Sequence, residues 1–212
     1  MPRKRDLRKL RRSFFARDAA HLAPALIGTI LVHRVRDDNG RVVGTLRARI
    51  VETEAYVGPH DLACHAAKGR TARTEVMFGR AGHAYVYFIY GMYDMLNIVA
   101  ATPGDAQAVL VRAAEPLDGW DADLSGPGKL AREMKITRTG HNTLDLTGDT
   151  LFLLEDPAAA KPRVAVSKRI GVEYAKKWKD ELLRFYDADS KAVSKVRIAP
   201  PRRRKLGKGS PN

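Results

Sequence analysis

The segment formed by residues 50–56 carries side chains that acid–base chemistry uses. Alternate residues of a strand share a face. One side of this strand would therefore carry Ile50, Glu52, Glu54 and Tyr56. The loop that follows adds His60 and His65. Two carboxylates beside a phenol and two imidazole rings can accept and donate protons in a reaction. Taken alone, the segment favours a simpler interpretation, a half-exposed strand whose two glutamates face water.

A second cluster holds four tyrosines within nine residues: Tyr85, Tyr87, Tyr90 and Tyr93. Strand alternation places Tyr85 and Tyr87 on one face and Tyr90 on the other, next to Gly91. Flat aromatic rings with a polar tip form stacking surfaces for nucleic-acid bases. Burial in the core with satisfied hydroxyl groups is the alternative, and it would account for about two of the four rings. A tyrosine at the tip of a turn fits a core position poorly.

A third group has the residue types of a zinc site, because His60, Asp61, Cys64 and His65 lie within six residues. The four form two adjacent pairs, and neighbouring side chains rarely converge on one tetrahedral ion. The sequence contains no second cluster of this kind. We therefore expect no metal and no other cofactor.

The elements that position these residues are indicated by turn signals and hydrophobic patterns. Asp18 can cap a helix that runs to about Ile27, with Gly28 closing it. Asp38-Asn39-Gly40 is a strong hairpin turn between two strands, and Gly126-Pro127-Gly128 begins a helix that runs to about Met134. The expected strands cover residues 29–35, 41–56, 84–90, 92–99 and 108–114, with further strands beyond Leu144 and Ala165. Such hairpin-like strands with few helices predict a single α+β domain with a mainly antiparallel sheet.

Length and composition limit the class of protein. A chain of 212 residues suits one domain with a full core and is too short for two. No apolar run approaches the roughly 18 residues that span a bilayer, and the basic start leads into no signal-peptide segment. Cys64 is the single cysteine, which excludes an internal disulfide and suits a reducing cytosol. We expect a soluble, cytoplasmic protein that does not bind membranes, associated with the nucleoid in a bacterium or nuclear in a eukaryote.

The net charge of +14 is concentrated at the two ends of the chain. Residues 1–12 contribute +6 and residues 191–212 contribute +8, so the intervening residues are neutral overall. Basic arms on a neutral body favour sequence-independent binding to phosphates, although solvated tails that keep the protein soluble would have the same composition. We expect a basic arm over residues 1–12, a folded domain over residues 13–186 and a disordered basic tail over residues 187–212.

In order and with small gaps, the motifs of residues 13–186 resemble the alkyladenine (3-methyladenine) DNA glycosylase family. The first set comprises Arg49–Tyr56 (RIVETEAY), Gly58-Pro59, His65, Met77-Phe78, Tyr85–Tyr87, Tyr90–Tyr93, Asn97 and Arg112–Leu117 (RAAEPL). The second set comprises Gly126-Pro127, Lys129-Leu130, Arg169–Val172 and Leu183–Tyr186. The two basic ends fall outside the resemblance.

The resemblance implies a single domain with helices around its twisted sheet and a protruding β-hairpin that enters the minor groove. Tyr90 would be the wedge that replaces a flipped nucleotide. The flipped base would lie between Tyr87 on one side and Tyr56 with His65 on the other. Asn97 would crowd the 2-amino group of normal guanine and so reject it.

The resemblance also implies the chemistry. Glu54 would activate a water that attacks the sugar C1′, and Arg112 and the carbonyl oxygen of Val172 would hold that water. A water nucleophile makes the enzyme monofunctional, leaving an abasic site. The expected partner is double-stranded DNA with damaged purines: 3-methyladenine, with 7-methylguanine, hypoxanthine and ethenoadenine as further candidates. The protein would act as a monomer.

Some positions depart from the family pattern. Thr74 stands where asparagine is more common, Arg80-Ala81-Gly82 lacks a frequent proline, and Asp94 puts a negative charge where the DNA backbone would pass. Two alternatives remain open at this point. One is a non-enzymatic nucleic-acid-binding protein, which explains the tails and tyrosines but not the set of Glu54, Tyr56, His65, Asn97 and Arg112. The other is a family member that acts on RNA or a nucleotide.

Overall fold

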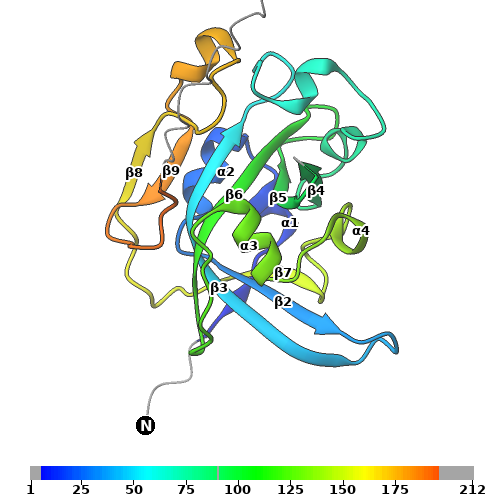
Figure 1. Cartoon of the computed structure of the whole chain (residues 1–212), viewed down its shortest axis with the longest axis vertical. Helices are drawn as coiled ribbons and strands as arrows, with labels where there is room; N and C mark the ends of the chain where they lie inside the picture. Colours follow the sequence, from blue (N-terminus) through cyan, green and yellow to red (C-terminus); the bar gives the residue numbers. More distant parts are fainter. Residues whose placement is uncertain (1–5, 90, 196–212) are drawn as a thin grey trace, which may run out of the picture.

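The computed structural model describes residues 6–89 and 91–195. Within these residues, nine strands form one antiparallel sheet (Figure 1). The main order of the strands is β1-β7-β2-β3-β6-β5-β4, and β9 pairs with both β3 and β8 beside this order. The strands are β1 (Arg8–Lys9), β2 (Ile30–Arg36), β3 (Val42–Tyr56), β4 (Ala84–Ile89), β5 (Tyr93–Ala100), β6 (Gln107–Pro116), β7 (Leu151–Glu155), β8 (Val164–Ser167) and β9 (Arg184–Asp187). The α-helices are α1 (Arg12–Phe15), α2 (Ala19–Leu26), α3 (Pro127–Glu133) and α4 (Arg138–His141). The fold class expected from the sequence, a single α+β domain with a mainly antiparallel sheet, is confirmed.

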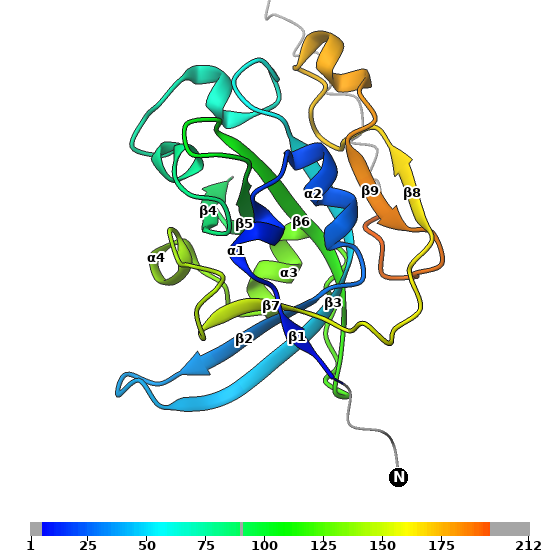
Figure 2. The ribbon, with the colours of Figure 1, turned by 180° about the vertical axis from the view of Figure 1, so that it is seen from behind.

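The hairpin of β2 and β3 forms where the Asp38-Asn39-Gly40 turn predicted it. Gly40 has a φ of +77°, the left-handed conformation for which glycine is favoured in such turns. The outer part of β3, residues 42–45, is exposed, whereas residues 50–55 are fully buried. This long strand therefore leaves the body at one end and crosses its centre at the other (Figures 1 and 2).

A β-bulge in the middle of β3 changes which side chains share a face. The register against β6 slips between Ile50 and Glu52 and again between Glu52 and Thr53. An extra residue in one strand reverses the alternation beyond it. Ile50 therefore joins Ala55 in the main hydrophobic core, and the expectation that Ile50 lies beside Glu52, Glu54 and Tyr56 is wrong.

The helices cover the sheet where the strands have their apolar side chains. Helix α2 lies along β3 and β6, and α3 lies along β5 and β6 (Figure 2). Buried leucines of both helices, Leu22, Leu26 and Leu130, contribute to the main core. Helix α3 approaches β5 closely, because a Cβ on Gly128 would stand 2.7 Å from the ring of Tyr93. That contact places α3 against the end of the β4–β5 hairpin that is next to the turn, where Tyr93 pairs with Ile89.

The segment between β3 and β4, expected as a loop, contains two short 3-10 helices, η1 (His65–Lys68) and η2 (Glu75–Phe78). A third, η3 (Lys176–Asp180), precedes β9. No helix within residues 6–89 and 91–195 has the length and apolar character to cross a membrane.

The folded body extends beyond the bounds expected from the sequence. At the start, Arg8 and Lys9 pair with β7, and Arg12 binds Asp145 at 2.5 Å. At the end, Ser194 is only 7 % exposed and binds a buried carboxylate of β3. Residues 8–12 and 187–195, which the sequence assigned to a basic arm and to a disordered tail, pack against this body. The remaining ends, residues 1–5 and 196–212, lie outside the described residues.

Candidate active site

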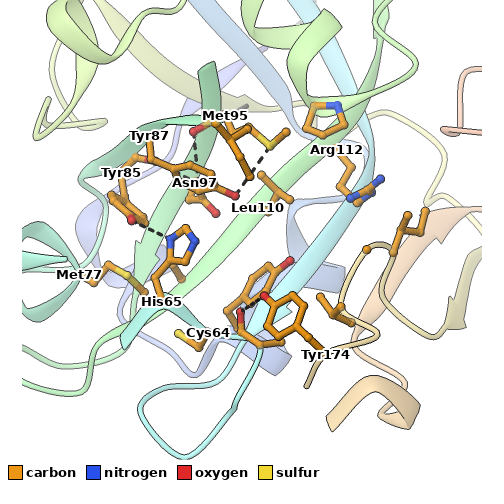
Figure 3. A pocket seen from close by; sticks show the side chains of 18 residues that line it. Cys64, His65, Met77, Tyr85, Tyr87, Met95, Asn97, Leu110, Arg112 and Tyr174 are labelled. Carbon is orange, nitrogen blue, oxygen red and sulfur yellow. Dashed lines mark hydrogen bonds between the residues drawn. The ribbon is translucent and has the colours of Figure 1, made fainter. Parts of the chain in front are cut away.

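A cavity of about 260 Å³ opens between the centre of the sheet and two loops. Its walls come from β3 and β6, from the β4–β5 hairpin, from η1 and from the loop after β8 (Figure 3). Of the eight site residues that the sequence predicted, six line it: Tyr56, His65, Tyr87, Asn97, Arg112 and Val172. Glu54 lies directly behind the wall, and Tyr90 lies outside the described residues.

Glu54 is fully buried and is held by three groups that themselves line the cavity. The backbone N–H of Ile170 donates to Oε1 at 2.8 Å, and the hydroxyl group of Tyr56 donates to Oε2 at 3.0 Å. Arg112 Nη1 lies 3.3 Å from Oε2. A carboxylate offers about four acceptor sites, so three donors leave one of them unused. The interpretation of Glu52 and Glu54 as water-facing residues of a half-exposed strand is wrong.

Arg112 joins the two buried glutamates. It is 8 % exposed, and its Nε donates to Glu52 at 3.0 Å while its Nη1 faces Glu54. Burial alone would lower the pKa of Arg112, but the charges of Glu54 and Glu52 outweigh burial and raise it. The guanidinium therefore stays charged and fixes the separation of the two carboxylates.

Tyr56 and the loop behind it are held by a buried ion pair that sequence reasoning missed. Arg169 binds both oxygens of Asp61, at 2.5 and 2.9 Å, and both side chains are fully buried. The guanidinium of Arg169 also lies over the ring of Tyr56, 4.8 Å from its centre. Burial, followed by the charge of Glu54, raises the pKa of Tyr56 well above its usual value, so its hydroxyl group remains a donor. Arg169 belonged to a matched motif, but its partner lies 108 residues away.

His65 is an uncharged hydrogen-bonding group at the cavity wall. Burial, with the nearby cations Arg73 and Lys68, lowers the pKa of His65 to about 4. Its Nδ1 lies 2.8 Å from the hydroxyl group of Tyr85, and Figure 3 shows the second ring nitrogen on the side away from Tyr85. A phenol donates to a neutral imidazole nitrogen more readily than it accepts from one. Nδ1 then accepts, and Nε2 carries the proton.

Tyr87 and His65 are in direct contact in this structure. His65 meets Tyr87 edge to face, with the ring centres 4.6 Å apart and the planes at 71°. A base sandwiched between two rings needs about 7 Å between them, from two contacts of ~3.5 Å. A base between Tyr87 and His65 would therefore require the two rings to move apart, and the predicted stacking of a base between Tyr87 and Tyr56 with His65 stays a prediction.

Asn97 is fixed in one orientation at the cavity. It is 3 % exposed, and its Nδ2 donates to the carbonyl oxygens of Tyr85 at 3.1 Å and of Met95 at 3.3 Å. Both amide hydrogens are thus used by the backbone, so the side chain cannot turn aside. A ligand in the cavity must fit around it.

The loop after β8 brings Val172 and Tyr174 to the cavity. The carbonyl oxygen of Val172 accepts from the N–H of Ala175 at 2.9 Å, which leaves its second lone pair for another donor. Tyr174 donates to the carbonyl oxygen of Ala63 at 3.4 Å and so connects this loop to the one before η1. Sequence reasoning did not identify Tyr174, because no pattern marks it.

The four residues weighed as zinc ligands have separate partners. Asp61 binds Arg169, His65 binds Tyr85, His60 lies against Trp178, and Cys64 donates to the carbonyl oxygen of Ala106 at 3.8 Å. Burial raises the pKa of the Cys64 thiol to about 11, which disfavours the metal-binding thiolate. Within the described part of the chain, no group of three or more potential ligands is arranged around a common point.

Comparison with known proteins finds one family. The family model described as "Methylpurine-DNA glycosylase (MPG)" matches residues 13–191. A protein of Legionella pneumophila (strain Paris) is 45% identical over 191 residues, which cover 90% of this chain and 100% of the relative. A protein of Myxococcus xanthus is 50% identical, over 91% of this chain and 96% of its own length. One of Methanocella arvoryzae is 43% identical, over 88% and 96%. All three carry the name "Putative 3-methyladenine DNA glycosylase".

These matches define the class as DNA glycosylases, hydrolases that act on N-glycosyl bonds in DNA and serve base-excision repair. The chain belongs to the methylpurine-DNA glycosylase family.

Proposed function

We propose that this enzyme flips an alkylated or deaminated purine out of duplex DNA and hydrolyses its N-glycosidic bond with a water activated by Glu54. The observation that carries the proposal is the position of Glu54, fully buried behind the cavity and bound by three groups that line it. A flipped base in the cavity would bring its sugar towards this carboxylate. The expected substrates are 3-methyladenine, with 7-methylguanine, hypoxanthine and ethenoadenine as further candidates.

Glu54 would perform the chemical step. Its remaining acceptor site binds a water, and the carboxylate takes a proton from this water as the oxygen attacks C1′. The C1′–N bond breaks at the same time and the base leaves with the electron pair, while the carboxylate stabilises the positive charge of the oxocarbenium-like transition state. The second lone pair of the Val172 carbonyl oxygen provides another acceptor for that water. Arg112 keeps the carboxylate in place and charged. Because the reacting side chain is a carboxylate rather than an amine, the product is an abasic site without a Schiff base, as in a monofunctional enzyme.

Recognition would come from the rest of the cavity. Tyr56 and Tyr87 stack on a base, and a base that carries positive charge after alkylation binds best to such electron-rich faces. His65 donates through Nε2–H to an acceptor on the edge of the base. The fixed Asn97 crowds the 2-amino group of a guanine base, which selects against normal guanine and disfavours 7-methylguanine relative to adenine lesions.

DNA binding would involve regions beyond the cavity. Tyr90, between β4 and β5, would fill the space that the flipped nucleotide leaves. The strands that carry it are paired from Ala84–Ile98 to Ile89–Tyr93, and Gly128 anchors the hairpin through Tyr93. The basic ends of the chain would add contacts to phosphates. The protein would act as a monomer.

The proposal is tested by incubating the full-length protein with duplexes that each carry one defined lesion, followed by alkali to cleave abasic sites. We expect strand cleavage at 3-methyladenine and none in the undamaged duplex. A reaction without alkali separates a monofunctional enzyme from one that also cuts the strand. Intact strands for every lesion with excess protein over long incubation would refute the proposal.

A further inference from the structure

Glu52 is a second buried carboxylate beside the proposed catalytic Glu54, and its role is unassigned. It is fully buried and accepts four hydrogen bonds. Arg112 Nε donates at 3.0 Å and Arg184 Nε at 2.6 Å to Oε1. Ser194 donates twice, from its backbone N–H to Oε2 at 2.6 Å and from its hydroxyl group to Oε1 at 2.8 Å. A buried carboxylate with this many donors is firmly fixed.

The charges around the two glutamates balance only with Arg184. Arg112 contacts both Glu52 and Glu54, whereas Arg184 contacts Glu52 alone. Two buried carboxylates are thus neutralised by two guanidinium groups. Arg184, 7 % exposed, is itself held in position by Ser167, whose hydroxyl group accepts from its Nη1 at 3.0 Å.

Ser194 reaches Glu52 because the chain beyond β9 folds back along the sheet. The N–H of Ala188 donates to the carbonyl oxygen of Arg163 at 2.9 Å, and the hydroxyl group of Ser190 donates to Glu115 at 2.5 Å. This segment, residues 188–194, therefore ends at the back of the active site.

We propose that Arg184 and Ser194 are positioning residues for the glycosylase reaction: by holding Glu52, they leave one side of Arg112 free to hold Glu54. The inference rests on the proposed function, in which Glu54 activates the water. Without Arg184, Arg112 must neutralise two buried carboxylates. It would be drawn towards Glu52, Glu54 would move, and one of the pair would take up a proton more easily.

The test compares Arg184→Gln with Arg184→Lys, which restores the charge, and with Arg36→Gln as a matched control. Arg36 is exposed at the end of β2, where it donates to the carbonyl oxygen of Gly40, and it does not line the cavity. For each variant we would measure the affinity for a lesion duplex and the single-turnover cleavage rate across a range of pH. The wild type must cleave first; if it does not, the proposed function fails, and this inference fails with it.

For Arg184→Gln we expect the cleavage rate to fall on the order of 10²-fold, because a displaced catalytic group is costly, with lesion affinity within about twofold of the wild type. The acid limb of its pH–rate profile should move to higher pH by about one unit. Arg184→Lys should recover part of the rate and of the profile. Arg36→Gln should match the wild type. A cleavage rate and pH profile for Arg184→Gln equal to those of the wild type would overturn the inference.

Ser194→Ala provides a milder variant if Arg184→Gln does not fold. It removes one of the two Ser194 hydrogen bonds and keeps the backbone donor. We expect a fall in cleavage rate of about tenfold, again without loss of lesion affinity and with the acid limb moved in the same direction. An equal loss of rate and affinity, or an unshifted pH profile, would show that this network only stabilises the fold.

Discussion

The two walls of the cavity differ in how they are built. The carboxylate wall, where Arg112 lines the cavity and Glu52 and Glu54 lie behind it, is charged, and each of these side chains is bound by partners from several elements. The aromatic wall, formed by His65, Tyr85 and Tyr87, is uncharged and is held by the hydrogen bonds of Tyr85 to His65 and of Tyr87 to the sulfur of Met95, and by contacts between the rings. One wall is organised to keep charge in place, and the other to offer flat surfaces and a donor.

This difference suggests a division of labour. Fixed charges in a buried site act on the transition state, where charge develops, and contribute little to binding the ground state. Aromatic faces act on any base that enters, before the bond breaks. Variants of the carboxylate wall should therefore lose rate, and variants of the aromatic wall should lose affinity or selectivity.

The largest expected effect is that of Glu54→Gln. The substitution keeps the shape of the side chain but removes the base and its negative charge, so single-turnover cleavage should fall by ~10²–10⁴-fold. Glu75→Gln is the control, because Glu75 is an exposed glutamate paired with Arg70. A rate for Glu54→Gln close to that of the control would remove Glu54 from the mechanism.

Selectivity should change at Asn97. Asn97→Ser shortens the side chain that meets the base, so excision of guanine derivatives should rise by about tenfold relative to adenine derivatives. The measurement compares single-turnover rates on duplexes with 7-methylguanine and with 3-methyladenine. An unchanged ratio would show that Asn97 supports β4 and β5 without selecting the base.

The pH dependence of stability should respond to a pair of histidines outside both walls. His33 and His141 are buried, their Nε2 atoms are 3.1 Å apart, and burial lowers the pKa of each. Next to them, Lys135 lowers the pKa of His33 and Asp94 opposes the lowering for His141. The unfolded chain binds protons near pH 6.5, while the folded chain resists them. The uncharged pair therefore lowers the stability of the fold only below pH 6.5, and the loss grows as the pH falls.

Below pH 6.5, each such histidine lowers the free energy of unfolding by up to about 1.4 kcal/mol per pH unit. His141→Gln should give a smaller decrease in Tm between pH 7 and pH 5 than the wild type, whereas the same change at the exposed His21 should leave the decrease unaltered. Parallel curves for the wild type and His141→Gln would contradict the assignment.

The smallest expected effect concerns the basic C-terminal end. Truncation should begin at residue 196, because Ser194 binds Glu52. It removes six positive charges: Arg197, Arg202, Arg203, Arg204, Lys205 and Lys208. Binding to damaged and undamaged duplexes should weaken equally, and each lost phosphate contact should reduce the slope of log affinity against log salt by ~0.9. An unchanged slope would show that this end does not contact DNA.

The sequence predicted the strands and the residues that meet at the cavity. It did not predict the burial of the glutamates, the bulge in β3 or the folded segment that ends at Ser194. Alternation placed Glu54 and Tyr56 together, and the hairpin turn at Gly40 fixed the start of β3. Neither signal could show that the two glutamates are buried, because burial depends on the cations that neutralise them. These cations, Arg112 and Arg184, lie 60 and 132 residues from Glu52 in the sequence. The bulge that reverses Ile50 depends on pairing between strands, which no local pattern encodes. The sequence did not predict that the chain is folded as far as Ser194, because the residues after β9 have the composition of a polar tail.

The division between the walls is tested most directly by measuring affinity and single-turnover rate for one lesion duplex in two variants, Glu54→Gln and Tyr87→Leu. We expect Glu54→Gln to bind the duplex as tightly as the wild type but barely to cleave it. Tyr87→Leu should bind more weakly by roughly 5- to 150-fold, which corresponds to ~1–3 kcal/mol of stacking, and should cleave at close to the wild-type rate when enzyme is saturating. Loss of both properties in each variant would contradict this division.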